Sequence, residues 1–169
     1  MIICTIRGES LSSLKMHEDA TEFSHSSVLL QETLDVIDAA SRRHIVDATL
    51  GLGGHTEAML ELSPECSVLG IDQDDAAIEI ASKRLERFGS RFTVAKGNFS
   101  DVARIVKNAG FGPPDAIIAD LGVSSLQFDD ASRGFSFRFD APLDMRMDPA
   151  SGGQTAAELL LETSETDIA

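Results

Sequence analysis

Hydrophobic positions along the chain follow two periods that alternate in a regular order. Short, largely apolar runs occupy residues 44–50, 66–72 and 115–122, as buried strands do, and residues 91–98 contain a shorter apolar stretch that also fits a strand. Between these runs, residues 56–63, 76–88 and 99–110 carry apolar side chains at helical spacing, and a proline or glycine stands at or just after the end of each. Residues 26–39 show the same helical spacing before the first strand.

This order predicts an α/β fold built from βαβ units around one parallel sheet with right-handed crossovers. The fourth apolar run is almost wholly hydrophobic, as a strand covered on both faces should be. Residues 123–154 then show no clear periodicity, and loops of that length are usually functional or disordered. Residues 154–169 return to a helical pattern. We read residues 1–23 as an N-terminal extension of uncertain order.

Composition narrows the class of protein further. The length of 169 residues predicts one domain, and no apolar run approaches the ~18–20 residues that span a bilayer. The start of the chain contains no apolar run typical of a signal peptide, and Cys4 and Cys66 form no CxxC pattern, so we expect free thiols in a reducing cytoplasm. The net charge of −14 argues against a free-standing nucleic-acid binder.

A glycine-rich turn follows the first predicted strand and indicates a nucleoside site. Gly51, Gly53 and Gly54 let the backbone approach a ligand, and Asp72 ends the second strand, where a carboxylate can accept ribose hydroxyls. A dinucleotide fingerprint would need a third glycine at position 56, which is Thr56. A nicotinamide-dependent oxidoreductase is therefore disfavoured but kept as an alternative, beside a purely structural turn with an exposed Asp72.

The acid-xxx-GxGG spacing, with Asp47 as the acid, instead resembles the methyl-donor loop of S-adenosylmethionine-dependent methyltransferases. That donor has no pyrophosphate and is cationic, so acidic surroundings are compatible with it. At the end of the third strand, Phe99 is a candidate for contact with adenine, and Asn98 or Asp101 for a hydrogen bond with its amino group. For Phe99 a core position is an equal alternative, and for Asp101 we favour a plain first-turn helix charge.

Residues 120–148 carry the most specific motifs: DLGVSSLQ, RGFSF and PLDMRM. With HSSVLL (25–30), TLGLGGHT (49–56) and GIDQD (70–74), they resemble the bacterial family of small-subunit ribosomal RNA cytosine-N4 methyltransferases over about residues 24–169. The resemblance implies a Rossmann-like methyltransferase fold with four parallel strands in the order 3-2-1-4. It implies S-adenosyl-L-methionine as cofactor, with contacts from Gly53, Gly54, His55, Asp72, Phe99, Asp120 and Gln127.

The chemistry needs a group that polarises the cytosine amine, because the lone pair of that amine is delocalised into the ring. Asp120, Ser124 and Ser125 are the candidate catalytic residues. The two serines equally fit a role in shaping the loop. Many amino-methyltransferases use a D/N/S-PP-aromatic turn at this place, and DLGVSS differs from it, so their mechanism does not transfer directly.

Aromatic and basic residues interleave in the same segment, as they do where unstacked bases are held. The candidate contacts to substrate RNA are Arg133, Phe135, Phe137, Arg138 and Arg146. The alternative is that the phenylalanines fasten the loop to the core. A second basic run, residues 83–107 with seven basic and two acidic residues, fits a solvated helical face better than an RNA patch.

Family members are substantially longer, which predicts that residues 24–169 are an incomplete methyltransferase domain ending near the start of the family's helical insertion. The fourth strand would then be an exposed apolar edge. A donor-binding half-domain without transfer activity is the alternative function. We expect small-subunit ribosomal RNA as partner, neither a membrane nor a metal, and leave a homodimer open. The negative net charge predicts that most of the contacts with RNA come from elsewhere, either from the family's remaining portion or from the assembled ribosomal particle.

Overall fold

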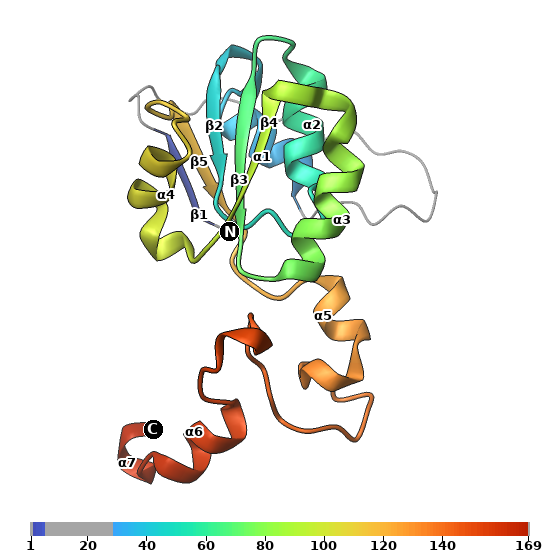
Figure 1. Ribbon diagram of the computed structural model, residues 1–169, viewed down its shortest axis with the longest axis vertical. Helices are drawn as coiled ribbons and strands as arrows, with labels where there is room; N and C mark the ends of the chain where they lie inside the picture. Colours follow the sequence, from blue (N-terminus) through green and yellow to red (C-terminus); the bar gives the residue numbers. More distant parts are fainter. Residues whose placement is uncertain (1, 6–28, 169) are drawn as a thin grey trace.

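The computed structural model describes residues 2–5 and 29–168 (Figure 1). The strands in this part of the chain form one five-stranded sheet, with helices packed against it. The strand order is β1-β5-β2-β3-β4. Strands β2 (His44–Asp47), β3 (Ser67–Asp72), β4 (Phe92–Lys96) and β5 (Ala116–Ala119) are parallel. Their order confirms the predicted 3-2-1-4 arrangement. Most of the predicted N-terminal extension and the start of the HSSVLL motif lie outside the described residues.

The expectation of an exposed edge at the fourth predicted strand is wrong. Strand β1 (Ile2–Thr5) pairs antiparallel with β5, from Ile2 opposite Ala119 to Thr5 opposite Ala116. This pairing satisfies backbone groups of β5 that would otherwise form an open edge. The four-residue β1 was missed because it lies at the very start of a segment that shows no helix or strand period.

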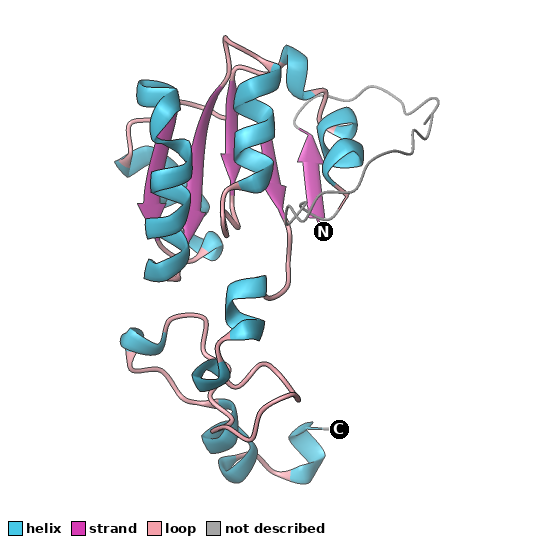
Figure 2. Ribbon diagram, turned by 90° about the vertical axis from the view of Figure 1, so that its right-hand side faces the viewer, coloured by secondary structure: helices cyan, strands magenta, loops and turns pink. Residues whose placement is uncertain are grey.

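Helices cover both faces of the sheet, which explains why its central strands are continuously apolar (Figures 1 and 2). One face packs against α1 (Leu30–Val36), α2 (Gly54–Leu62) and α3 (Asp75–Leu85), and the other against α4 (Val102–Asn108). Ile45 and Val68 face the first core, whereas Val46 and Leu69 face the second, and all four are fully buried. The sheet is therefore the middle layer of an α/β/α sandwich.

The segment after β5 leaves the sandwich at the carboxyl ends of the parallel strands and extends below them in Figure 1. It contains the short helix α5 (Ser125–Asp129), an irregular stretch, and then α6 (Ala156–Glu162) and α7 (Glu165–Ile168). The single helix predicted for residues 154–169 is divided, because Thr163 adopts an extended conformation and ends α6. Leu159, Leu160 and Leu161 of α6 are exposed.

Close packing at Gly70 of β3 yields the first prediction. A β-carbon at position 70 would lie 2.7 Å from Cδ1 of Leu50, a residue of the glycine-rich turn. We expect Gly70→Ala to lower the free energy of unfolding by about 1–3 kcal/mol, measured by urea denaturation, because the core has no room for the methyl group.

Two further variants isolate the cause. Gly122 has an ordinary backbone conformation and nothing within 4 Å of an added β-carbon, so Gly122→Ala should leave stability unchanged or raise it slightly, by up to ~1 kcal/mol. In a Leu50→Ala background the same Gly70→Ala change should cost almost nothing. An equal cost in both backgrounds would contradict the packing explanation.

Candidate functional site: a cavity at the carboxyl ends of the strands

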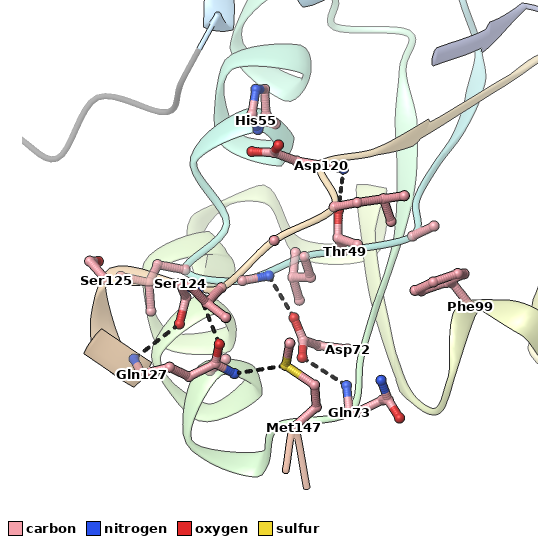
Figure 3. Close-up of a pocket in the computed structure, with 18 of the residues that line it drawn as sticks. Thr49, His55, Asp72, Gln73, Phe99, Asp120, Ser124, Ser125, Gln127 and Met147 are labelled. Carbon is pink, nitrogen blue, oxygen red and sulfur yellow. Dashed lines mark hydrogen bonds between the residues drawn. The ribbon is translucent and has the colours of Figure 1, made fainter. Parts of the chain in front are cut away.

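A cavity of about 980 Å³ opens where the parallel strands end, which is the usual ligand position in open α/β sheets (Figure 3). Four segments line it: the turn between β2 and α2, the turn between β3 and α3, the end of β4, and the segment after β5. Most of the sequence-predicted site residues meet here. Gly54, His55, Asp72, Phe99, Asp120 and Gln127 all line the cavity, with Ser124, Ser125 and Phe135.

The glycines of the β2–α2 turn have two different tasks. Gly51 and Gly53 both adopt left-handed backbone angles, with φ of 51° and 81°, which side-chain-bearing residues rarely adopt. Gly51 and Gly54 line the cavity. Gly53, a predicted donor contact, is not among the lining residues. A β-carbon at Gly53 would lie 3.0 Å from Cδ1 of Leu85, so this glycine brings α2 close to α3.

Asp72 links the turn between β2 and α2 to the turn between β3 and α3, both of which line the cavity. Its Oδ2 accepts a hydrogen bond from the Gly51 backbone N–H at 2.8 Å. Its Oδ1 accepts from the backbone N–H groups of Gln73 and Asp74, at 2.7 and 3.0 Å. Three donors therefore occupy most of the carboxylate's acceptor capacity. A ribose bound here either uses the remaining capacity or displaces the Gly51 N–H.

Two further hydrogen bonds fix the segments that surround the cavity. The buried carboxylate of Asp47 accepts from the Thr56 hydroxyl at 2.8 Å and fixes the first turn of α2. Burial raises the pKa of Asp47, although the hydrogen bond from Thr56 opposes this shift. Asp47 does not line the cavity, so its carboxylate stabilises the turn between β2 and α2 and does not contact a bound ligand. Thr49 Oγ1 accepts from the Asp120 backbone N–H at 2.7 Å and links the glycine turn to the end of β5.

His55 provides a test of whether a ligand fits the cavity. The side chain is only 8% exposed, and its Nε2 has no hydrogen-bond partner among the described residues. A buried polar atom without a partner costs about 1–3 kcal/mol, so it marks a position where a polar ligand group is expected. Figure 3 shows His55 close to Asp120, whose carboxylate points toward it. A polar, zwitterionic donor fits these groups.

The end of β4 supplies the candidate adenine contacts. Phe99 lines the cavity and is 41% exposed, so it is not a plain core residue. Asn98 uses its Oδ1 to accept from the Ser100 N–H and its Nδ2 to donate to Gln73 Oε1. Asp101 pairs with Arg104 at 2.6 Å on the surface, in agreement with the simpler reading of it as a helix-turn charge.

Ser124 and Gln127 form a reciprocal cap at the start of α5. Gln127 N–H donates to Ser124 Oγ at 3.3 Å, and Ser124 N–H donates to Gln127 Oε1 at 3.0 Å. The S-x-x-Q spacing of residues 124–127 is a capping-box pattern, and it could have predicted this helix from the sequence. Ser124 therefore shapes the loop while it lines the cavity, and the Ser125 side chain lies beside it (Figure 3).

Asp74 is the principal residue that sequence reasoning missed. It caps α3 by accepting from the Ala76 N–H, and its Oδ2 accepts from Arg133 Nη1 at 2.6 Å and Gln127 Nε2 at 3.3 Å. Asp74 is 4% exposed and Arg133 is 9% exposed. Burial raises the pKa of Asp74, but the hydrogen bonds from Arg133 and Gln127 prevail and hold that pKa below its usual value.

This arrangement corrects the expected role of Arg133 as an RNA contact. Its guanidinium is buried against Asp74 and also donates to the carbonyl oxygens of Arg146 and Met147, at 3.1 and 2.9 Å. Gly134 follows it with φ of 72°, and a β-carbon there would lie 2.5 Å from the Pro142 carbonyl oxygen. The RG pair of the RGFSF motif thus folds the loop back on itself and onto α3.

The other candidate RNA contacts separate into three environments. Arg146 pairs with Asp144 and, by hydrogen bonding to it, lowers the pKa of Asp144 to about 2, which indicates a loop-stabilising role. Phe135 is half-buried at the cavity. Phe137 and Arg138 are exposed, and Arg138 has no ion pair within residues 29–168. Only the last two lie free on the surface for a large ligand.

The basic run at residues 83–107 behaves as the solvated face that we favoured. Lys83 pairs with Glu79, Arg87 with Glu57 and Glu61, and Lys96 with Asp75 and Asp148. Arg91 donates to carbonyl oxygens at the end of α2 and just beyond it. Within the described part of the chain, no group of three acidic, histidine or cysteine side chains is placed to hold a metal, and no helix is long and apolar enough to cross a membrane.

Comparison with known proteins gives a consistent family. The sequence model of the MraW methylase family matches residues 22–169. A ribosomal RNA small subunit methyltransferase H from Beutenbergia cavernae is 46% identical over 147 residues, which are 85% of this chain and 44% of the relative. The protein of the same name from Carboxydothermus hydrogenoformans is 45% identical, over 87% of this chain and 47% of its own. The chain thus spans about half the length of the curated relatives it matches.

Among solved structures, a protein-L-isoaspartate O-methyltransferase aligns with a TM-score of 0.48 and 22% identity. The alignment covers 63% of this chain and 33% of the other.

The contact between Asp74 and Arg133 generates the second prediction. Asp74→Asn can still cap α3, but its amide N–H₂ then faces the donors of Arg133 and Gln127 and leaves a buried guanidinium unpaired. We expect a loss of about 3 kcal/mol or more in the free energy of unfolding, and faster hydrogen exchange across residues 120–148. Adding Arg133→Met to Asp74→Asn should reduce the loss. Asp129→Asn, at an exposed acid of α5, is the matched control and should change little.

The lowered pKa of Asp74 gives a third prediction, on pH. A carboxyl whose pKa is lower in the folded than in the unfolded protein contributes stability above its unfolded pKa, near 4, and loses it as the pH falls through the folded value. The stability difference between wild type and Asp74→Asn should therefore be constant from about pH 5 to 7 and shrink below about pH 4. Urea denaturation followed by circular dichroism measures it, and a difference that grows on acidification would contradict the assignment.

Proposed function

The chain belongs to the MraW methylase family, and on this premise we propose that it carries the donor site for methyl transfer from S-adenosylmethionine to the N4 amine of a cytidine in small-subunit ribosomal RNA. The observation that carries the proposal is that one cavity contains both the glycine turn with Asp72 and the DLGVSSLQ segment. A nucleoside-binding edge and a group able to polarise an amine therefore meet within one site.

The residues that would hold the donor divide along the cavity. Asp72 and Phe99 lie at one end, where the ribose and adenine belong by the strand-end rule. His55, with its unpartnered Nε2, lies elsewhere in the cavity and suits the amino-acid portion of the donor, and the Asp120 carboxylate points toward it (Figure 3). The donor supplies an electrophilic methyl group on a cationic sulfonium, which acidic surroundings stabilise.

In the transfer itself, the amine nitrogen forms a bond to the methyl carbon while the carbon–sulfur bond breaks and sulfur keeps the electron pair. The nitrogen then carries one proton too many, which must pass to an acceptor. We assign the polarising role to Asp120, because no hydrogen bond occupies its carboxylate within residues 29–168, while its backbone N–H is fixed by Thr49. Ser124 and Ser125 are placed to hold the amine, and positioning supplies much of the rate gain in such a transfer.

A cytosine must leave its stack to bring its amine to a methyl donor held inside this cavity. The exposed Phe137 and Arg138 are suited to stack against a neighbouring base, and Phe135 to contact the entering one. The net charge of −14 weakens phosphate binding by this chain alone, so the RNA grip is expected from the remaining half of the family's length or from the ribosomal particle.

The fourth prediction tests the proposal by a labelled methyl-transfer assay on small ribosomal subunits. Transfer to a cytidine amine is expected, and Asp120→Ala should lower its rate by about 10²-fold or more, because the departing proton loses its acceptor. Donor affinity, measured by calorimetry, should fall much less. The matched control is Asp129→Ala, which removes an exposed acid of the same segment and should leave the rate unchanged.

Three other outcomes have separate meanings. Donor binding without transfer in wild type would support the donor-binding alternative. Binding of NAD in preference to the S-adenosyl donor would support the oxidoreductase alternative. Undiminished transfer by Asp120→Ala would remove Asp120 from the polarising role.

A further inference from the structure

A chain of hydrogen bonds behind the cavity fixes the orientation of two side-chain amides. The Ser100 backbone N–H donates to Asn98 Oδ1 at 2.9 Å, at the start of the 3₁₀ turn Phe99–Asp101. Because a backbone N–H can only donate, this contact identifies the oxygen of the Asn98 amide. The Asn98 nitrogen Nδ2 must then be the atom that donates to Gln73, at 3.1 Å, and the Gln73 atom it meets must be the oxygen Oε1.

The consequence lies in the other half of the Gln73 amide. With Oε1 held by Asn98, the two N–H groups of Nε2 are turned away from Asn98. No hydrogen bond from this nitrogen occurs within residues 29–168, and Gln73 lines the cavity whereas Asn98 does not. Figure 3 shows the Gln73 amide next to Asp72, on the side where Phe99 lies. A fixed, unused donor therefore faces the cavity beside the ribose-binding carboxylate.

The surrounding backbone makes this donor distinctive. The Gln73 N–H is already used by Asp72 Oδ1 at 2.7 Å, and the Gly51 N–H by Asp72 Oδ2 at 2.8 Å. Asp72 itself only accepts. The amide of Gln73 is thus the group at this position that can donate to a ligand acceptor next to a ribose. In a purine nucleoside, the acceptor nearest the sugar is the ring nitrogen N3.

We propose that Gln73 is a specificity-determining residue that donates from Nε2 to N3 of the purine, and that Asn98 is the positioning residue that holds it in that orientation. This inference rests on the proposed function, because it takes the ligand to be an adenosyl compound. It adds a hydrogen bond to the purine base at a site where Asp72 binds only the ribose.

The test is a calorimetric titration of the 169-residue chain with S-adenosylhomocysteine and with its 3-deaza analogue, in which a C–H group replaces N3. Wild type should bind the analogue about fivefold more weakly, the range expected for one neutral hydrogen bond. Gln73→Met, similar in size but unable to donate, should bind both ligands with equal affinity to within about twofold, at the level of wild type with the analogue.

Asn98→Asp tests the positioning role. The new carboxylate still accepts from the Ser100 N–H, but it can only repel Gln73 Oε1, so the Gln73 amide should turn over and present its oxygen to the cavity. Discrimination between the two ligands should disappear, while the melting temperature stays close to that of wild type. Ser100→Ala retains the backbone N–H that orients Asn98, and as the matched control it should keep the full discrimination.

The possible results separate this inference from the proposed function. If wild type binds S-adenosylhomocysteine and Gln73→Met discriminates between the two ligands as wild type does, the role of Gln73 is overturned and the donor site stands. If Asn98→Asp keeps full discrimination, the positioning role of Asn98 is overturned. If wild type binds neither adenosyl ligand, the proposed function fails and this inference fails with it.

Discussion

The site depends on one buried ion pair, between Asp74 at the start of α3 and Arg133 in the segment after β5. The other polar contacts of residues 120–148 with the sandwich are the Asp120 N–H to Thr49, the amide of Gln127 to Asp74, and the surface pair of Lys96 with Asp148. A buried pair of this kind adds little net stability, because desolvation offsets the attraction. Its strength lies in specificity, since leaving either charge unpaired in the interior is costly. We infer that the pair favours the loop arrangement in which the segment after β5 lines the cavity.

Four aspartates at the strand ends show how the fold separates structural charge from chemical charge. Asp47 accepts hydrogen bonds from the Thr49 N–H and the Thr56 hydroxyl, and Asp72 accepts from three backbone N–H groups. Asp74 forms a buried ion pair with Arg133. Asp120 differs, because within residues 29–168 its carboxylate meets no donor and lines the cavity. The first three carboxylates hold the turns in place. The fourth keeps its full acceptor capacity, which is the property that a polarising group requires.

The parallel sheet could be predicted from the sequence because its central strands, β2 and β3, are buried on both faces and form largely apolar runs between helical segments. The glycine turn and Asp72 were also predictable, since their chemistry depends on local sequence at a strand end. β1 was not, because four residues carry too little pattern and their pairing with β5 is set more than 100 residues later in the chain. Arg133 was misjudged for a similar reason: nothing local distinguishes an arginine that binds RNA from one that meets a buried carboxylate 59 residues away.

The same limit explains why Asn98 was singled out from the sequence whereas its hydrogen-bond partner Gln73 was not. Asn98 was a candidate for direct contact with adenine, but both ends of its amide are committed, one to Ser100 and the other to Gln73. Because Gln73 lines the cavity and Asn98 does not, we infer that Asn98 acts on a ligand through Gln73. Neighbouring parallel strands bring these two residues together, because β3 and β4 end side by side in register at Asp72 and Lys96. On the role proposed for Gln73, the selectivity of this cavity comes from two residues that the sheet aligns, and an assignment made residue by residue gives the contact to the wrong member of the pair.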